Sequence, residues 1–377
     1  MTGRILQFGT SRFLQAHVDL FVHEARAAGQ TVGPITVVQT SAAVERSGRI
    51  AAFGAPGGYP VIIRGLENGA PVERRLMVSS VDRGLSAIHD WAELRRLFAT
   101  SVDVVVLNTG DTGYDVAPAD RQPSLLAAAP PASFPGKLTA LLHHRWQEGG
   151  QPLTILPCEL LQQNGRALRD CVVALAEAAQ TAPDFRHWLG ESVLWVNTLV
   201  DRIVSEAIEP IGAIAEPYAL WAIERQPGLT LPFSHPSVVL ADDLEPFERL
   251  KLHILNLGHT VLADLWLQQG KPAQQTVRQM LAEPRIRSEL ENVYRQEVLP
   301  GFAMRGMRDQ AEAYMATTLE RFLNPFLAHR LADIAQNHAA KVERRIAGFL
   351  AWAADGGAQL TAPVLRAIVA RAAGATP

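Results

Sequence analysis

The stretch Ile5-Leu-Gln-Phe-Gly-Thr-Ser-Arg12 decides the fold that we expect for the first half of the chain. A short apolar strand runs directly into a glycine turn, and a helical pattern follows from Arg12 to about Ala28. Apolar runs then alternate with helical patterns further along the chain, as is typical of a parallel sheet covered by helices. We therefore predict an α/β domain at the N-terminus.

Three further strands and one hairpin extend this pattern. The predicted strands are Ile35-Thr-Val-Val-Gln39, Val102-Asp-Val-Val-Val-Leu107 and Leu153-Thr-Ile-Leu156, of which the second is the clearest buried strand. A helix is expected at about 135–148, before the last of them. The turn-forming pairs Gly57-Gly58 and Asn68-Gly69 bracket the run 59–64, which predicts a hairpin inserted into the α/β pattern.

The second half of the chain has a different character. From about Ser237 onward nearly every segment has helical spacing, and prolines at 284, 300 and 325 punctuate the helices. We predict two domains with a boundary near residue 190. Residues 1–190 form a dinucleotide-binding α/β domain of Rossmann type with a parallel-rich sheet, and residues 191–377 form a mostly α-helical substrate and catalytic domain.

Composition restricts the function classes. The 377 residues are 48% hydrophobic and 19% charged, which is typical of a soluble globular protein. A net charge of -3 argues against nucleic acid or an anionic membrane as the main partner. Cys158 and Cys171 are too few for a disulfide framework or a cysteine zinc site. The sequence shows neither a signal peptide nor a transmembrane run. We expect a cytoplasmic protein, monomeric or a small homo-oligomer, that acts on a small molecule.

The turn after the first strand is the predicted start of a dinucleotide site. Gly9 permits a tight turn, and the helix that follows offers backbone N–H groups and a positive dipole end to a pyrophosphate. Ser11 stands where the usual fingerprint has its second glycine. The predicted cofactor contacts here are Phe8, Gly9, Thr10, Ser11, Arg12 and Phe13. The alternative is an ordinary strand-to-helix turn.

Two other strand ends are expected to complete the cofactor site. The second strand ends in Gln39 and Thr40 rather than in the acid that usually binds the NAD ribose. Because Arg46 and Arg49 follow, NADP stays open beside NAD, although both arginines could equally be solvated. The segment Asn108-Thr-Gly-Asp-Thr-Gly-Tyr114 follows the strongest strand, where α/β sheets bind ligands. We predict cofactor contacts from Asn108, Thr109 and Gly110, the alternative being a plain turn.

The segment Lys251-Leu-His-Ile-Leu-Asn-Leu-Gly-His259 carries the candidate chemistry. At ~100° per residue, His259 lies about 80° from Lys251, Asn256 about 140°, and His253 about 200° and so outside that arc. The surface then offers a base, an amide and an imidazole, which suits interconversion of an alcohol and a carbonyl. The alternative is an amphipathic helix with a solvated lysine.

Taken in order, these motifs resemble the polyol-specific long-chain dehydrogenase/reductase family, which includes mannitol dehydrogenases, mannitol-1-phosphate 5-dehydrogenase and the fructuronate and tagaturonate reductases. The matching segments are residues 8–19, 108–114, Pro157-Cys-Glu-Leu-Leu-Gln-Gln-Asn-Gly165, Val200-Asp-Arg-Ile203, 251–259 and Arg321-Phe-Leu-Asn-Pro-Phe-Leu-Ala-His329. The third and last are closest in style to the uronate reductases. The turn at Gly9 and a length below that of typical uronate reductases depart from the family pattern.

The resemblance implies site residues and a metal-independent hydride transfer. It matches Lys251 to the general acid/base, Asn256 and His259 to its companions, and Asn164 to an oxyanion-hole asparagine. Asp201 and Arg202 match a motif that lies near the active site. From their chemistry, Arg321, His329 and Lys341 could bind a substrate carboxylate or phosphate. Structural alternatives are a turn at Asn164-Gly165, a packed ion pair at 201–202, and exposed basic residues on helices.

We therefore predict an NAD(P)-dependent oxidoreductase that interconverts a polyol or aldonate hydroxyl and a ketose or ketouronate carbonyl. Two alternatives stay open at this point. One is a dehydrogenase of a phosphorylated polyol, and the other is a dinucleotide-binding protein without catalysis.

Overall fold

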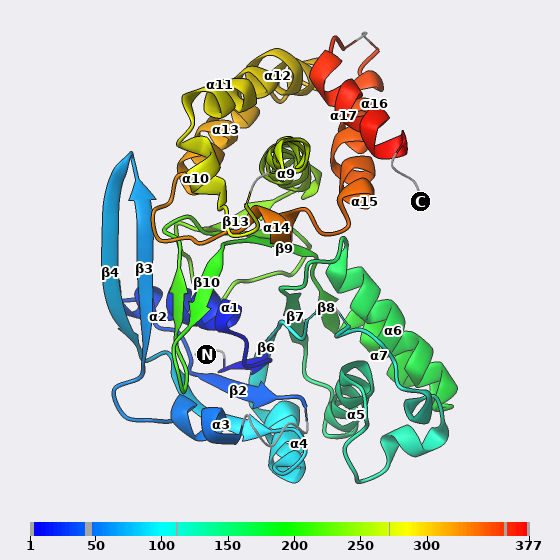
Figure 1. Cartoon of the computed structure of the whole chain (residues 1–377). Helices are drawn as coiled ribbons and strands as arrows, with labels where there is room; N and C mark the ends of the chain where they lie inside the picture. Colours follow the sequence, from blue (N-terminus) through cyan, green and yellow to red (C-terminus); the bar gives the residue numbers. More distant parts are fainter. Residues whose placement is uncertain (1–3, 42–46, 111, 271, 358–359, 375–377) are drawn as a thin grey trace. The chain divides into compact units, whose positions relative to one another are not determined.

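The protein consists of two compact units in a computed structural model that describes residues 4–41, 47–110, 112–270, 272–357 and 360–374 (Figure 1). Unit 1 comprises Met1–Ile63 and Arg74–Leu244, and unit 2 comprises Arg64–Glu73 and Glu245–Pro377. The boundary expected near residue 190 lies inside unit 1, at the end of helix α7 (Pro183–Glu191). The chain extends well past it before it leaves unit 1, because short strands follow that the sequence pattern did not reveal.

A six-stranded parallel sheet forms the centre of unit 1 (Figure 1). Its strands, in spatial order, are β5 (Val81–Ser86), β2 (Ile35–Gln39), β1 (Arg4–Phe8), β6 (Val102–Leu107), β7 (Leu153–Pro157) and β8 (Val193–Trp195). Counted along the chain this is the order 3-2-1-4-5-6 of a Rossmann fold. All five pairings are parallel. The predicted fold class is confirmed.

Alternate residues of the central strands pack on opposite faces of the sheet, as the period of two requires. Leu6 and Phe8 of β1 join a core with helices α4 (Trp91–Thr100), α5 (Phe134–Gln147), α6 (Asn164–Ala178) and α7. Ile5 points to the other face, where it joins a core with Phe21 of α2 (Val18–Ala27). Other helical segments in the described part of unit 1 include α3 (Ser47–Phe53) and the single turns Pro118–Asp120 and Pro123–Leu126.

The single helix expected from Arg12 to Ala28 is interrupted. The structure has α1 (Arg12–Gln15) and α2, with His17 at φ -126° and ψ -97° between them. The His17 amide donates back to Leu14 O at 3.1 Å, and the buried imidazole lies 3.1 Å from Leu220 O. Burial lowers the pKa of His17 to about 3. The break arises because this ring is held against a distant strand, a contact that local periodicity does not report.

Two smaller sheets complete unit 1. One has the order β10-β11-β3-β4 and the other β13-β12-β9. The bounds are β3 (Tyr59–Glu67), β4 (Ala70–Val78), β9 (Thr198–Asp201), β10 (Val204–Ala207), β11 (Ala213–Ala215), β12 (Leu220–Glu224) and β13 (Val238–Ala241). The predicted hairpin is confirmed as β3–β4. The helical character expected from about Ser237 begins at Glu245, because β13 comes first and pairs in parallel with β12.

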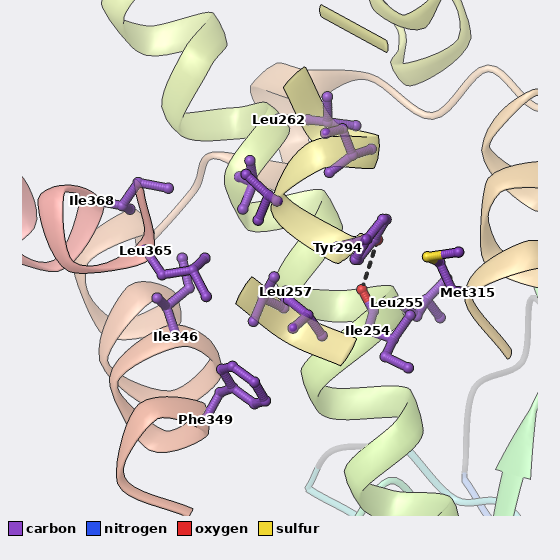
Figure 2. Packing of buried hydrophobic residues seen from close by; sticks show 14 of the residues in the cluster. Ile254, Leu255, Leu257, Leu262, Tyr294, Met315, Ile346, Phe349, Leu365 and Ile368 are labelled. Carbon is purple, nitrogen blue, oxygen red and sulfur yellow. Dashed lines mark hydrogen bonds between the residues drawn. The ribbon is translucent and has the colours of Figure 1, made fainter. Parts of the chain in front are cut away.

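Unit 2 is helical, as predicted. Its segments are α8 (Glu245–Leu250), η4 (Lys251–Asn256), α9 (Leu257–Gln269), α10 (Val277–Leu281), α11 (Pro284–Val293), η5 (Tyr294–Val298), α12 (Leu299–Met304), α13 (Arg308–Phe322), α14 (Leu331–Ile334), α15 (His338–Val342), η6 (Glu343–Ala347), α16 (Gly348–Ala354) and α17 (Pro363–Gly374). The segments η4, η5 and η6 are π-helical. Figure 2 shows buried residues of the core that surrounds η4 and α9.

The tip of the β3–β4 hairpin belongs to unit 2. Asn324 Nδ2 donates to Arg64 O at 3.4 Å, and the Gly69 amide donates to Glu320 Oε1 at 2.6 Å. The Arg64 guanidinium lies 5.2 Å from the centre of the Phe326 ring, within the range of a cation–π contact. These contacts join residues 64–73 to helix α13 and the loop after it. Among the described residues, no helix has the length and apolar character needed to cross a membrane.

Candidate active site

The carboxyl ends of β1 and β6 meet where the strand order of the sheet reverses, the point at which open α/β sheets bind ligands. Gly9 follows β1 with φ +111°, and its amide donates to Val38 O at 2.9 Å. A Cβ at Gly9 would lie 2.3 Å from Asn108 O. Only glycine therefore permits this close approach of the two strand ends.

Hydrogen bonds tie three strand ends together at this point. Ser11 Oγ donates to Asn108 Oδ1 at 3.0 Å and accepts from the Leu14 amide at 3.3 Å, so it also caps α1. Asn108 Nδ2 donates to Cys158 O at 2.8 Å, beyond β7. The Glu159 carboxylate accepts from the Thr109 amide at 2.5 Å and from Thr109 Oγ1 at 2.9 Å. Sequence reasoning gave Glu159 no role, although it quoted the motif around it.

The predicted cofactor residues divide into two groups. Gly9, Ser11, Asn108 and Thr109 gather at the strand ends just described. The other predicted residues lie in different surroundings. Phe8 is part of the sheet core, Thr10 is buried, Thr40 is half-buried, and Arg12 and Gly110 are exposed. The Phe13 ring stacks on the His17 ring with centres 4.7 Å apart, and Gln39 Nε2 donates to Ser41 O at 3.0 Å. Arg46 and Asp111 lie outside the described residues, and Arg49 pairs with Glu209 at 3.0 Å.

Asn164 begins α6 and is fully buried. Its Nδ2 lies within 2.9–3.2 Å of the carbonyl oxygens of Pro157, Glu159 and Thr198, and its Oδ1 accepts from the Thr198 amide at 2.9 Å. The turn offered as the alternative is not present, because a helix begins here. The amide ties the end of β7 to β9. Its predicted oxyanion role stays a prediction, and that role requires one of these bonds to be exchanged for a substrate oxygen.

Asp201 and Arg202 follow one another but face different surroundings within unit 1. Asp201 is buried at the end of β9. Arg202 donates from Nε and Nη2 to Glu216 O at 3.1 and 2.8 Å, and from Nη1 to Ala16 O at 2.7 Å. Burial lowers the pKa of Arg202 to about 10. The guanidinium lines a cavity of about 390 Å³ together with Arg74 and His235. A substrate contact from either residue stays a prediction.

In unit 2, the segment of the candidate base is π-helical. The Leu257 amide donates to Leu252 O, five residues back, as π geometry requires. Residues five apart then lie one turn apart on the same side, so the Asn256 backbone lies over that of Lys251. The expected angle of about 140° between them assumed regular α geometry, and it does not hold here. Such π segments occur frequently at functional sites.

The two histidines of this helix lie in different surroundings. His253 is buried, its Nδ1 lies 3.1 Å from Arg345 O, and its ring stacks on Trp352 with centres 5.7 Å apart. His259 lies beside Phe322 and beside His329, at ring-centre distances of 4.3 and 4.7 Å. The two candidate site residues His259 and His329 are thus brought together, whereas His253 packs in the core.

Cationic groups surround His259. Burial holds the pKa of His259 well below its usual value, and the neighbouring His329, Arg345, Arg321 and Lys341 lower it further. Burial likewise lowers the pKa of His329, with Asp333 acting in the opposite direction. The imidazole of His259 is therefore neutral at neutral pH, and it lies in a region of positive potential. Such a region favours an anionic ligand.

Arg345 is a site candidate that sequence reasoning missed. Its Nη1 donates to Thr260 Oγ1 at 3.1 Å and to Asn256 O at 3.4 Å. Lys341, four residues earlier, donates to Ile334 O at 2.8 Å, and burial and Arg345 lower its pKa. A spacing of four on one helix was the available signal, because it places both cations on one side. Arg345 thus contacts the backbone of the candidate catalytic helix, at Asn256 O.

Within the part of the chain that the structure describes, no group of three or more His, Cys, Asp or Glu side chains could hold a metal ion.

Comparison with known families identifies both halves of the chain. The mannitol dehydrogenase Rossmann domain matches residues 3–231, and the mannitol dehydrogenase C-terminal domain matches residues 243–372. Together these matches span most of the sequence. The expected family and the expectation of an oxidoreductase of that family are confirmed.

Curated relatives and solved structures agree. Altronate oxidoreductase of Bacillus subtilis (strain 168) is 30% identical over 368 residues, which cover 91% of this chain and 73% of that protein. Altronate oxidoreductase of Yersinia pestis is 31% identical over 372 residues, covering 91% and 74%. The structure of a D-sorbitol dehydrogenase has a TM-score of 0.80 at 20% identity over 92% of this chain and 75% of that one. A Pseudomonas fluorescens mannitol 2-dehydrogenase, solved as a ternary complex with NAD and D-mannitol, has a TM-score of 0.70 at 19% identity, covering 99% and 79%.

Proposed function

The chain belongs to the mannitol dehydrogenase family, and on that premise we propose that it is an NAD-dependent oxidoreductase of an aldonate or polyol. It interconverts a substrate hydroxyl with the carbonyl of a ketouronate or ketose. The observation that carries the proposal is the cationic surrounding of His259, on the helix that bears Lys251 and Asn256. Relatives about 30% identical are named altronate oxidoreductases, and an aldonate is an anion that this surrounding suits.

The residues at the carboxyl ends of β1 and β6 fit a dinucleotide. Gly9 leaves the backbone open where a Cβ would collide with Asn108, and Ser11 adds a hydroxyl at the same turn. We assign cofactor binding to the turn Gly9–Phe13 and to Asn108–Gly110. Bound NAD would accept hydride in oxidation and return it in reduction. Whether the protein prefers NAD or its 2′-phosphorylated form NADP depends on the region of Arg46 and Arg49. NADP is therefore tested alongside NAD.

Lys251 acts as the general base in oxidation. Neutral Lys251 removes the proton of the substrate hydroxyl, and protonated Lys251 returns it in reduction, without a metal ion. Asn256 donates a hydrogen bond to the substrate oxygen as negative charge develops on it. Neutral His259 orients the same hydroxyl by a hydrogen bond. The cations near His259 favour the neutral form of any amine close to them.

The substrate carboxylate is held by the basic groups of unit 2. Arg321 and Lys341 supply the charge near His259, and neutral His329 offers a hydrogen bond. Arg321 donates to Tyr314 Oη at 3.3 Å, which fixes its position. A guanidinium binds a carboxylate through two parallel hydrogen bonds, so Arg321 is the strongest single candidate. A phosphorylated polyol would satisfy the same charge, and it is therefore the alternative to be tested.

The decisive experiment is a substrate screen with a paired variant. The wild-type protein is assayed with NAD and NADP against altronate, mannitol, sorbitol and a polyol phosphate. We expect altronate with NAD to have the highest kcat/KM. Lys251→Ala should lower kcat by about 10²- to 10⁴-fold and leave the NADH affinity, measured by fluorescence titration, within twofold.

Two results would contradict the proposal. Turnover by Lys251→Ala close to that of the wild type would remove the assignment of the base. Binding of NADH without oxidation or reduction of any compound in the panel would favour a non-catalytic dinucleotide-binding protein. Preference for the phosphorylated polyol would keep the chemistry and change the substrate class.

A further inference from the structure

The π segment η4 accepts a hydrogen bond from a tyrosine of another helical segment. Tyr294 is fully buried, and its hydroxyl donates to Ile254 O at 2.9 Å, the bond drawn as a dashed line in Figure 2. Burial raises the pKa of Tyr294, so the hydroxyl keeps its proton. In a regular α-helix this carbonyl would accept from the Gly258 amide. The Leu257 amide also donates to Ile254 O, so the tyrosine adds a side-chain donor to this carbonyl at the transition from π to α geometry.

Gly258 makes room for that hydroxyl. A Cβ at Gly258 would lie 1.8 Å from Tyr294 Oη and 3.1 Å from Phe322 Cε2. The glycine is not required by its backbone angles, since it lies within a continuous helix. Its role is therefore the close approach of Tyr294. The hydroxyl of Tyr294, the carbonyl of Ile254 and the absence of a side chain at Gly258 together allow this contact. We call these three residues the Tyr294 lock.

The lock lies between the residues of the candidate site. Ile254 belongs to the segment 251–256, and Gly258 directly precedes His259. A π turn contains one residue more than the α turn that would replace it, so loss of the π geometry rotates Lys251 by roughly 100° relative to His259 and shifts it by about 1.5 Å along the axis. The relative placement of the base and its companions therefore depends on this turn.

We propose that Tyr294 is a positioning residue for catalysis: with Gly258 it holds residues 251–256 as a π turn and thereby aligns Lys251 with Asn256 and His259. The inference rests on the proposed function of Lys251. It adds to the site a residue of the π segment η5 that acts through the helix backbone and contacts neither substrate nor cofactor.

The primary test is Tyr294→Phe in the full-length protein. The variant keeps the ring and loses the donor. We expect kcat to fall about 10- to 100-fold, the effect of a misplaced catalytic group, with the KM for NAD unchanged. The pH dependence of kcat should also shift, because Lys251 moves to a different surrounding. A crystal structure of the variant should show residues 251–256 without the i→i+5 bond from Leu257 to Leu252.

A matched control comes from the same π segment. Glu297 is also buried, and its carboxylate accepts from the amides of Val364 and Leu365, both at 2.9 Å. Glu297→Gln should lower Tm but leave kcat and the pH profile unchanged. Gly258→Ala should lower kcat as Tyr294→Phe does, and the double variant should lose less than the two single effects combined, because the collision with Oη is removed. Either single variant suffices if the other does not fold.

The outcomes separate this inference from the proposed function. A folded Tyr294→Phe variant with the kcat and pH profile of the wild type, or one that retains the π turn, overturns the positioning role. A kinetic effect from Glu297→Gln equal to that of Tyr294→Phe also overturns it, because general destabilisation would then explain both. If Lys251→Ala remains active, the proposed function fails, whereas the crystal structure of Tyr294→Phe still decides whether the lock holds the π turn.

Discussion

The strand ends of unit 1 and the helices of unit 2 hold their polar groups in opposite ways. At the strand ends, Ser11, Asn108 and Glu159 accept from or donate to one another and nearby main-chain groups. Around His259, Arg345, Arg321 and Lys341 each disfavour the charged form of the imidazole. The first region is held by hydrogen bonds within the protein, whereas the second presents positive charge that suits an anionic substrate under the proposed function.

Under the proposed function, this difference would give the two regions separate tasks. A network that is already satisfied keeps its geometry, so it can present glycine backbone to a dinucleotide at little reorganisation cost. Under the proposed function, the positive charge around His259 would instead discriminate between substrates by their charge. Variants in unit 1 should therefore change cofactor affinity, and variants in unit 2 should change turnover and substrate choice.

The largest effect on this comparison is expected from Gly9→Ala. The new methyl group would meet Asn108 O at 2.3 Å, and φ +111° disfavours any residue but glycine. We expect the NADH dissociation constant to rise at least 30-fold, equivalent to about 2 kcal/mol, by fluorescence titration. Gly29→Ala is the control, since it also has positive φ but its Cβ meets nothing within 4 Å. Equal losses in both variants would point to backbone strain alone.

The histidine pair gives the next largest effect. We expect His259→Asn to lower kcat/KM about 10- to 100-fold, because the ring that orients the hydroxyl is lost. His253→Asn should lower Tm and leave kcat/KM within about threefold, since His253 packs on Trp352. Steady-state kinetics and thermal unfolding of the two variants give the comparison. Similar kinetic losses from both would remove the distinction between the two histidines.

A smaller effect is expected from Arg345→Gln. This change removes one positive group near His259, so kcat/KM for altronate should fall about tenfold, and that for mannitol or sorbitol by less. The neighbouring Arg344 is exposed, and Arg344→Gln serves as the control with no change expected. An equal loss for charged and uncharged substrates would show that Arg345 acts only through the helix backbone that it contacts.

The last effect concerns the stability of unit 1 and leaves cofactor binding and turnover unchanged. Burial raises the pKa of Asp19 from 3.8 to about 7, against hydrogen bonds from Tyr59 and Gln7 that lower it. The folded state therefore binds this proton more tightly, so the stabilisation is fully present below about pH 4 and is lost as pH rises through 7. We measure the free energy of unfolding of the wild type and of Asp19→Asn in urea. Between about pH 4 and pH 7, the wild-type value should fall by a few kcal/mol relative to that of the variant. A difference independent of pH would contradict the raised pKa.

Part of this architecture was predictable from local sequence because the relevant forces are local. The strands β2 and β6 are short β-branched runs, and both occur at the predicted residues. The Gly9 turn was predictable because a positive φ selects glycine. The ordered motifs also predicted the family, which the comparisons confirm.

Other features depend on partners far away in the sequence. The π turn at 251–256 is fixed by Tyr294, forty residues on, and nothing in the local spacing distinguishes it from an α turn. The break at His17 depends on Leu220. Likewise, the carbonyls that surround Asn164 come from three different segments. Sequence periodicity identifies a helix, but it does not show which distant contacts set the angular positions of its side chains.

The membership of the hairpin tip in unit 2 has a consequence for the order of folding. The bonds of Arg64 to Asn324 and of Gly69 to Glu320 join residues 260 and 251 positions apart. During synthesis the tip is made long before its helical partners, and loops of this length close slowly. A fragment that begins at Glu245 would lack the tip entirely. The helical unit is therefore completed only by the full chain, and its assembly is expected to be a late step of folding.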